Sequence, residues 1–186
     1  MSQADINAFV GAPGVNMTTA TSMKTAVTRG IPVNGRSFGW GDTALHNAVT
    51  WKRCDLVMAL LTTGADPNVK DNLGTTSVWE GAADSTADIL QLLIDSGGSV
   101  NEANDFGMTP LIVLVSYNYP DAPARLQVLL ATPELDLDAA CEGKMVEEWA
   151  VRRGHTEFAA VIAEERRRRE RWSTVRCAWV SATARS

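Results

Sequence analysis

Cysteine and long apolar runs are scarce in this chain of 186 residues. The three cysteines, Cys54, Cys141 and Cys177, lie at least 36 positions apart and form no CxxC pair, which argues against a zinc site or a disulfide framework. No stretch approaches the roughly 18 apolar residues of a membrane-spanning helix, and no basic segment followed by an apolar core opens the chain. We therefore expect free thiols in a reducing compartment, with a cytoplasmic location or, alternatively, a nuclear one.

Groups that could perform catalysis are equally few. The chain has two histidines, His46 and His155, and no G-x-S-x-G motif, phosphate-binding loop or metal-spaced cluster. An active site needs several titratable or nucleophilic groups that converge, and no such set is visible. We accordingly expect no catalytic residues, no cofactor and no metal, and we predict that the protein is not an enzyme.

The composition is that of one ordinary globular domain, with 45% hydrophobic and 21% charged residues. Its net charge of -5 does not draw the whole protein toward nucleic acid or an anionic membrane. Any basic function must therefore be local, and we expect a monomer.

A sequence motif recurs with a period of 33 residues. The segment 64–68, GADPN, reappears 33 positions later as GGSVN at 97–101. Threonines keep the same offset at Thr43, Thr76 and Thr109. The next unit is stretched, because Met145 follows Thr109 by 36 positions. A fixed period of this length is typical of stacked repeats, each of which needs its neighbours to bury an apolar face.

This unit resembles the ankyrin repeat, whose motif contains Gly-x-Thr-Pro-Leu-His and ends near Gly-Ala-Asp-x-Asn. The matching segments are GDTALH at 41–46, GTTSV at 74–78, GMTPL at 107–111 and a degenerate GKM at 143–145. The resemblance covers roughly residues 30–163. It implies an all-α solenoid of about four to five helix-turn-helix units with short extended fingers.

We divide the chain into an ankyrin-repeat domain, residues 1–163, and a basic, aromatic C-terminal helical extension, residues 164–186. The expected units are an N-terminal capping repeat (1–34), three repeats (35–68, 69–101 and 102–138) and a C-terminal capping repeat (139–163). Glu147 stands where Leu45 and Leu111 predict a buried apolar side chain, so the last unit should have one solvated face.

Local chemistry supports helices at these places. Each repeated threonine can cap the first helix of its unit, and Pro110 suits a first helical turn because its missing N–H is not needed there. Gly64 and Gly97 follow the second helices, where a left-handed residue commonly ends a helix.

The resemblance implies a concave groove lined by the fingers and by the ends of the first helices. The residues that we expect to line it and to bind a partner are Trp40, Asp42, Trp51, Leu73, Asp84, Asp105, Phe106, Met108 and Tyr117. Together they form an apolar strip with acidic residues at its edge, and exposed apolar patches mark interaction sites. The competing interpretation is that some of them, Trp40 and Phe106 in particular, pack on the neighbouring finger.

The C-terminal extension is a second candidate. Between residues 164 and 186 seven arginines and three glutamates give +4, which leaves -9 for residues 1–163. The candidate residues are Arg166, Arg167, Arg168, Arg169, Arg171 and Trp172. This segment could cap the repeats, extend as a solvated helix, dock a partner, or contact nucleic acid or a membrane.

We predict a non-catalytic adaptor that binds another protein or peptide, with a basic or amphipathic segment, in the ankyrin groove. The alternative is a tether to nucleic acid or an anionic membrane through the arginine-rich helix, which should weaken steeply with salt.

Overall fold

The computed structural model describes residues 32–117 and 119–183, with side chains as far as residue 172. The predicted N-terminal capping repeat, 1–34, lies almost wholly outside these residues. The helices are α3 (Ala44–Thr50), α4 (Cys54–Thr62), α5 (Ser77–Asp84), α6 (Ala87–Asp95), α7 (Pro110–Ser116), α8 (Ala122–Ala131), α9 (Val146–Arg152) and α10 (Thr156–Thr183). A short antiparallel hairpin of β1 (Ala140–Cys141) and β2 (Lys144–Met145) precedes α9.

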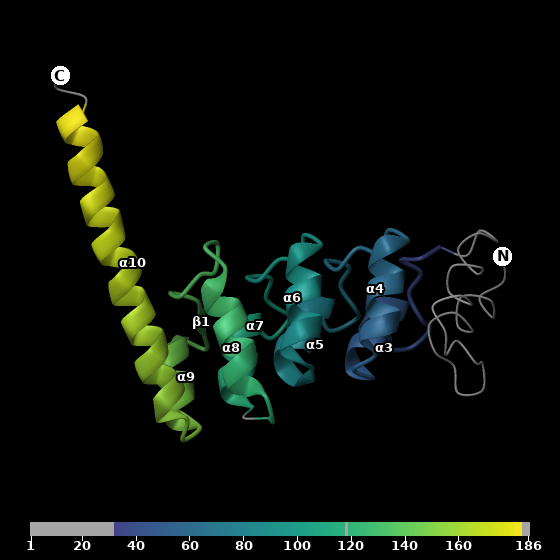
Figure 1. Ribbon diagram of the computed structural model, residues 1–186. Helices are drawn as coiled ribbons and strands as arrows, with labels where there is room; N and C mark the ends of the chain where they lie inside the picture. Colours follow the sequence, from purple (N-terminus) through teal and green to yellow (C-terminus); the bar gives the residue numbers. More distant parts are fainter. Residues whose placement is uncertain (1–31, 118, 184–186) are drawn as a thin grey trace.

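Helices joined by short turns form pairs, and the pairs stack in one direction (Figure 1). The first helices of the pairs, α3, α5, α7 and α9, contact one another in turn, and we call them the inner helices. The outer helices α4, α6 and α8 do the same, and α10 continues this row beside α8. The arrangement confirms the predicted all-α ankyrin-type solenoid.

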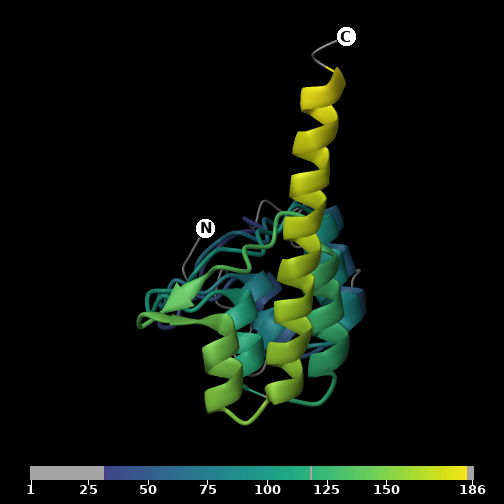
Figure 2. The same ribbon diagram turned by 90° about the vertical axis from the view of Figure 1, so that its left-hand side faces the viewer.

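The segments that lead into the inner helices are the predicted fingers. Seen along the stack, they project to one side of the helices, and β1 lies at the edge of this projection (Figure 2). Neighbouring fingers are joined by main-chain hydrogen bonds: the N–H of Asn72 donates to the carbonyl of Trp40, and that of Asp105 to Leu73, both at 2.9 Å. Residues 33 positions apart therefore lie in register along the stack.

The repeated threonines cap the inner helices as predicted. The hydroxyl oxygens of Thr43, Thr76 and Thr109 accept hydrogen bonds from backbone N–H groups three residues later, at 3.2 to 3.4 Å. Pro110 occupies the first turn of α7. The fourth inner helix has Met145 at this position, and the carboxylate of Glu148 instead accepts from the N–H of Met145 at 3.0 Å.

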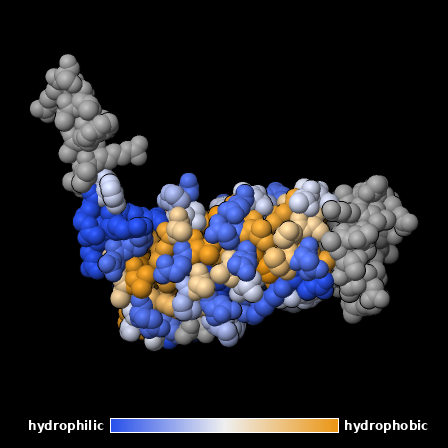
Figure 3. All heavy atoms as spheres, in the orientation of Figure 1, coloured by the Kyte–Doolittle hydropathy of each residue, from blue (hydrophilic) through white to orange (hydrophobic). Residues whose placement is uncertain are grey.

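Apolar side chains of the inner and outer helices form one continuous core. Leu45, Val78 and Leu111, at equivalent positions, are buried, as are Leu56 and Ile89 of the outer helices. Because each unit buries its apolar face against the next, stability comes from stacking. On the face shown in Figure 3, apolar and polar residues alternate over the stack, and strongly hydrophilic residues gather on α10.

The predicted domain boundary at 163/164 falls inside a continuous helix. α10 begins at Thr156, where the fourth unit needs its second helix, and runs to Thr183 without a break. Its beginning packs on α9 and α8, and its far part extends beyond the repeats (Figures 1 and 2). Among the described residues, no helix is both long and apolar enough to span a bilayer.

Two arginines attach α10 to the last repeat. Arg169 donates to the carbonyls of Leu130 and Thr132 at 3.0 Å and of Leu135 at 2.8 Å, in the last turn of α8 and just after it. Arg166 pairs with Asp138 at 3.0 Å and with the carboxylate of Glu147. Glu147 therefore faces a guanidinium of α10, and the expected solvated face of the last unit is covered by this helix.

Candidate functional site

The inner face is defined here as the surface formed by the fingers and by the C-terminal ends of the inner helices. Its finger residues Trp40, Leu73 and Phe106 are separated by 33 positions each, and the ladder between fingers aligns them. Their exposed fractions are 69%, 39% and 66%. Three large apolar side chains in one exposed row have no packing reason to be there, so the packed alternative for Trp40 and Phe106 is not favoured.

The ends of the inner helices form a second row. Trp51, Asp84, Tyr117 and Arg153 occupy equivalent positions at the ends of α3, α5, α7 and α9. Lys52 pairs with Asp84 at 2.8 Å, which links the first two ends. The guanidinium of Arg153 lies 5.8 Å from the ring centre of Tyr117, which links the last two. Trp51 and Tyr117 are exposed.

Carboxylates gather at the α3 and α5 part of the inner face. Glu80, on α5, interacts electrostatically with Asp42, Asp71 and Asp84. Burial, reinforced by these three neighbours, raises the pKa of Glu80 to about 7. Burial also raises the pKa of Asp42, although His46 acts in the opposite direction. This part of the inner face therefore concentrates negative charge that is only partly neutralised.

Cations gather at the other end, around α9. Lys144, Arg152 and Arg153 each lie about 6 Å from the ring centre of Trp149, at 5.9, 6.0 and 5.9 Å. The indole N–H of Trp149 donates to the carbonyl of Cys141 at 3.2 Å, which fixes the ring beneath them. Such stacking holds the positive groups in place while leaving the charges at the surface.

The structure places all nine predicted groove residues on the inner face, but not all are equally available. Asp105 is exposed, whereas Asp42 is half-buried and Asp84 is already paired with Lys52. Met108 is half-buried, and its carbonyl accepts from the indole N–H of Trp79 at 2.9 Å.

Sequence reasoning missed Glu80, Lys144, Arg152 and Arg153. Alignment of the repeats could have revealed two of these residues. Lys144 is the equivalent of Met108, and Arg153 of Tyr117, once the third step is counted as 36 residues.

His46 has a structural role. Its Nδ1 accepts from the backbone N–H of Thr43 at 3.1 Å, and its Nε2 lies 3.1 Å from the carbonyl of Thr75 in the next finger. Burial lowers the pKa of His46, so the neutral ring with a proton on Nε2 satisfies both contacts. Within residues 32–117 and 119–183, no group of acidic, histidine or cysteine side chains is arranged to hold a metal.

The arginines of α10 differ in what they contact. Arg166 and Arg169 hold the helix to the repeats, and Arg168 pairs with Glu165 at 2.7 Å. Arg167, Arg171 and Trp172 are exposed, with Trp172 at 70%. Two arginines of the run thus attach α10 to the last repeat, and the others contact α10 itself or solvent.

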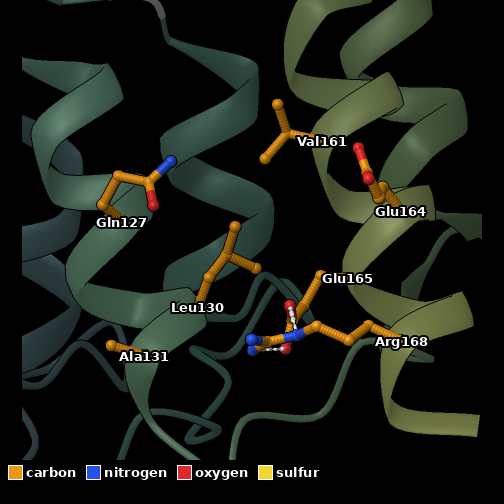
Figure 4. Close-up of a pocket in the computed structure, with 7 residues that line it drawn as sticks. All are labelled: Gln127, Leu130, Ala131, Val161, Glu164, Glu165 and Arg168. Carbon is orange, nitrogen blue, oxygen red and sulfur yellow. Dashed lines mark hydrogen bonds and ion pairs between the residues drawn. The ribbon is translucent and has the colours of Figure 1, made fainter.

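A cleft of about 350 Å³ lies between α8 and α10 (Figure 4). It is lined by Gln127, Leu130, Ala131, Val161, Glu164, Glu165 and Arg168. Glu165 and Arg168, both on α10, pair with each other on one side of the cleft, so these two charged groups are already satisfied. The inner face is therefore the stronger candidate for a binding site.

Comparisons with known proteins agree with the repeat geometry. The family model described as Ankyrin repeat matches residues 40–72. A Notch homolog 1 protein from Xenopus laevis is 33% identical over 141 residues, which cover 72% of this chain and 5% of that protein. The Drosophila melanogaster Notch protein is 31% identical over 96 residues, covering 51% of this chain and 4% of its own length.

A third relative is a glycerophosphocholine phosphodiesterase, gde1, from Schizosaccharomyces pombe. It is 33% identical over 99 residues, 52% of this chain and 9% of that protein. The chain thus corresponds to a small fraction of each relative's length. Ankyrin repeats in general mediate protein-protein interactions. The repeated caps, the finger ladder and the family match together show that this chain belongs to the ankyrin-repeat family.

Proposed function

We propose that the protein is a non-catalytic adaptor whose inner face binds a segment of a partner protein. The observation that carries this proposal is the exposed row of Trp40, Leu73 and Phe106 along the fingers. An isolated repeat stack gains nothing from exposing such side chains to water, whereas an interface would bury them. Their contacts would supply most of the binding energy, as large apolar anchors usually do.

Trp51, Phe106 and Tyr117 are the anchors proposed for this interface. They are about half exposed or more, at 51%, 66% and 44%. A buried aromatic side chain contributes up to about 150 to 250 Å² of contact area, so even partial burial of all three makes a substantial site. The carboxylates of Asp42 and Asp105 would attract positive charge on the partner, while Asp84 would do so in competition with Lys52.

The alternative, an electrostatic tether through α10, rests on the exposed arginines Arg167 and Arg171. Truncating the helix is a poor test of it, because that would also remove Arg166 and Arg169, which hold α10 to the last repeat. The charge reversal Arg167→Glu/Arg171→Glu leaves those contacts in place and is the better variant.

Affinity capture from lysate with three baits tests the two functions. The baits are the wild type, Trp51→Ala/Phe106→Ala and Arg167→Glu/Arg171→Glu, each checked for folding by circular dichroism. We expect protein partners that the aromatic variant loses and the charge variant keeps. Equal capture by wild type and the aromatic variant would contradict binding at the inner face. Nuclease-sensitive or lipid-associated capture that only the charge variant loses would support the tether instead.

A further inference from the structure

The charges on the inner face are segregated along the direction of the stack. The column that contains Asp42 continues as Thr75, Met108 and Lys144. The column at the helix ends, Trp51, Asp84, Tyr117 and Arg153, likewise passes from acidic to basic with an aromatic ring between. Both columns therefore change sign in the same direction, although Lys52 pairs with Asp84 and the third column, Trp40, Leu73 and Phe106, continues to the exposed Glu142.

Among the described residues, the acidic end has few compensating cations. Lys52 neutralises Asp84, and Arg36 donates to the carbonyl of Gly41 at 3.2 Å and to the side-chain oxygen of Asn72. Neither of these contacts pairs a cation with Glu80 or Asp42. Burial raises the pKa of both carboxyls, reinforced by three neighbouring carboxylates at Glu80 and by Asp71 at Asp42, where His46 opposes it. A cationic group of a ligand would relieve that repulsion.

The basic end has a corresponding excess of positive charge. Lys144, Arg152 and Arg153 share the ring of Trp149. Of the nearby acids, Glu148 accepts the N–H of Met145, Glu147 faces Arg166 of α10, and the exposed Glu142 lies two residues before Lys144. The three cationic groups gather around one aromatic ring, a geometry suited to receiving an anionic group.

We propose that the inner face takes a bipolar segment of a partner protein: a basic end over α3 and α5, an apolar middle on Leu73, Phe106 and Tyr117, and an acidic end over α9. This deepens the proposed function and rests on it, since it names the charge pattern of the partner segment. Complementary charges fix the register in which a segment lies and reject segments of the wrong pattern. A uniformly basic segment would be repelled at α9.

Selection from a displayed library of random 16-residue peptides on the wild-type protein tests this pattern. We expect enriched peptides with Lys or Arg on one side of an apolar centre and Asp or Glu on the other. One enriched peptide is then synthesised with its acidic half replaced by Asn and Gln. Neutralisation should weaken binding to the wild type about tenfold, as expected for two or three partly exposed ion pairs.

The variant Arg152→Glu/Arg153→Glu should abolish that tenfold difference, and Arg167→Glu/Arg171→Glu, which makes the same change in net charge on α10, should retain it. Two results would overturn the proposal: enriched peptides that are uniformly basic, or an acidic half that still strengthens binding to Arg152→Glu/Arg153→Glu. If the enriched peptides in either case still require Trp51 and Phe106 for binding, the bipolar pattern fails while the proposed binding at the inner face stands. The proposal would also be overturned if peptide binding did not depend on Trp51 and Phe106, or if no peptide were enriched. A dimer seen by light scattering, with a second copy of the chain on the inner face, would overturn it as well.

Discussion

Glu80 provides a direct test of the electrostatic argument. Burial and three neighbouring carboxylates raise its pKa from the ordinary value of 4.5 to about 7. The folded protein therefore holds this proton at a pH where the unfolded chain has lost it, and the free energy of unfolding must fall as pH rises between those values. A shift of this size corresponds to at most about 3 kcal/mol, all of it lost once the pH exceeds 7. Glu80→Gln keeps the shape of the protonated side chain and removes the titration.

We expect Glu80→Gln to be about 1 to 3 kcal/mol more stable than the wild type at pH 8 and nearly equal to it at pH 5. Urea unfolding followed by circular dichroism at several pH values measures this difference. Asp42 titrates in both proteins, so the difference between them reports Glu80 together with its coupling to the neighbouring carboxylates. The control is Glu134→Gln, an exposed glutamate in the loop after α8, which should change little. Equal pH dependence in Glu80→Gln and the wild type would refute the argument.

Three further substitutions test the packing. Gly74→Ala should destabilise the protein by about 1 to 3 kcal/mol in urea unfolding, because φ is +73° there and a Cβ would lie 2.8 Å from the backbone nitrogen of Asp105; an unchanged midpoint would contradict this. Arg169→Ala should lower stability by about 2 kcal/mol in urea unfolding, since charged hydrogen bonds to carbonyls at the end of α8 and just after it are lost. Hydrogen exchange should rise first in 130–135. Arg125→Met should be neutral or stabilising by about 1 kcal/mol in a thermal melt, since its Nε and Nη1 find no hydrogen-bond acceptor among the described residues; a clear loss would show that this buried cation is compensated.

The sequence predicted the repeat architecture well because its signals are local and recur at a fixed period. Thr43 and its equivalents cap helices through contacts three residues away, and Gly64 and Gly97 adopt the left-handed conformation that ends α4 and α6. Such features depend on a few neighbouring residues, so they can be recognised without any knowledge of the tertiary structure.

Features that depend on distant neighbours were less accessible. The sequence predicted that Glu147 is exposed to solvent. In the structure its carboxylate accepts a hydrogen bond from Arg166 of α10, which lies 19 residues later in the chain. The buried Arg125 had no signal in a periodic pattern of apolar residues. Of the site, the apolar row could be predicted from register alone. The charge segregation could not be recognised until the stretched third repeat was aligned and the cations around Trp149 were seen together.

The length and attachment of α10 also have a mechanical consequence. Arg166 and Arg169 fix its base, and residues 170–183 continue as helix for about 20 Å beyond them. Force applied at the far end of α10 would load the contacts of Arg166 and Arg169 a few at a time and would separate α10 from the end of α8. Since each repeat is stabilised by its neighbours, the last repeat would open first and expose the next. Traction on the helix would thus dismantle the basic end of the inner face before the acidic end, so tension would change which half of a ligand stays bound.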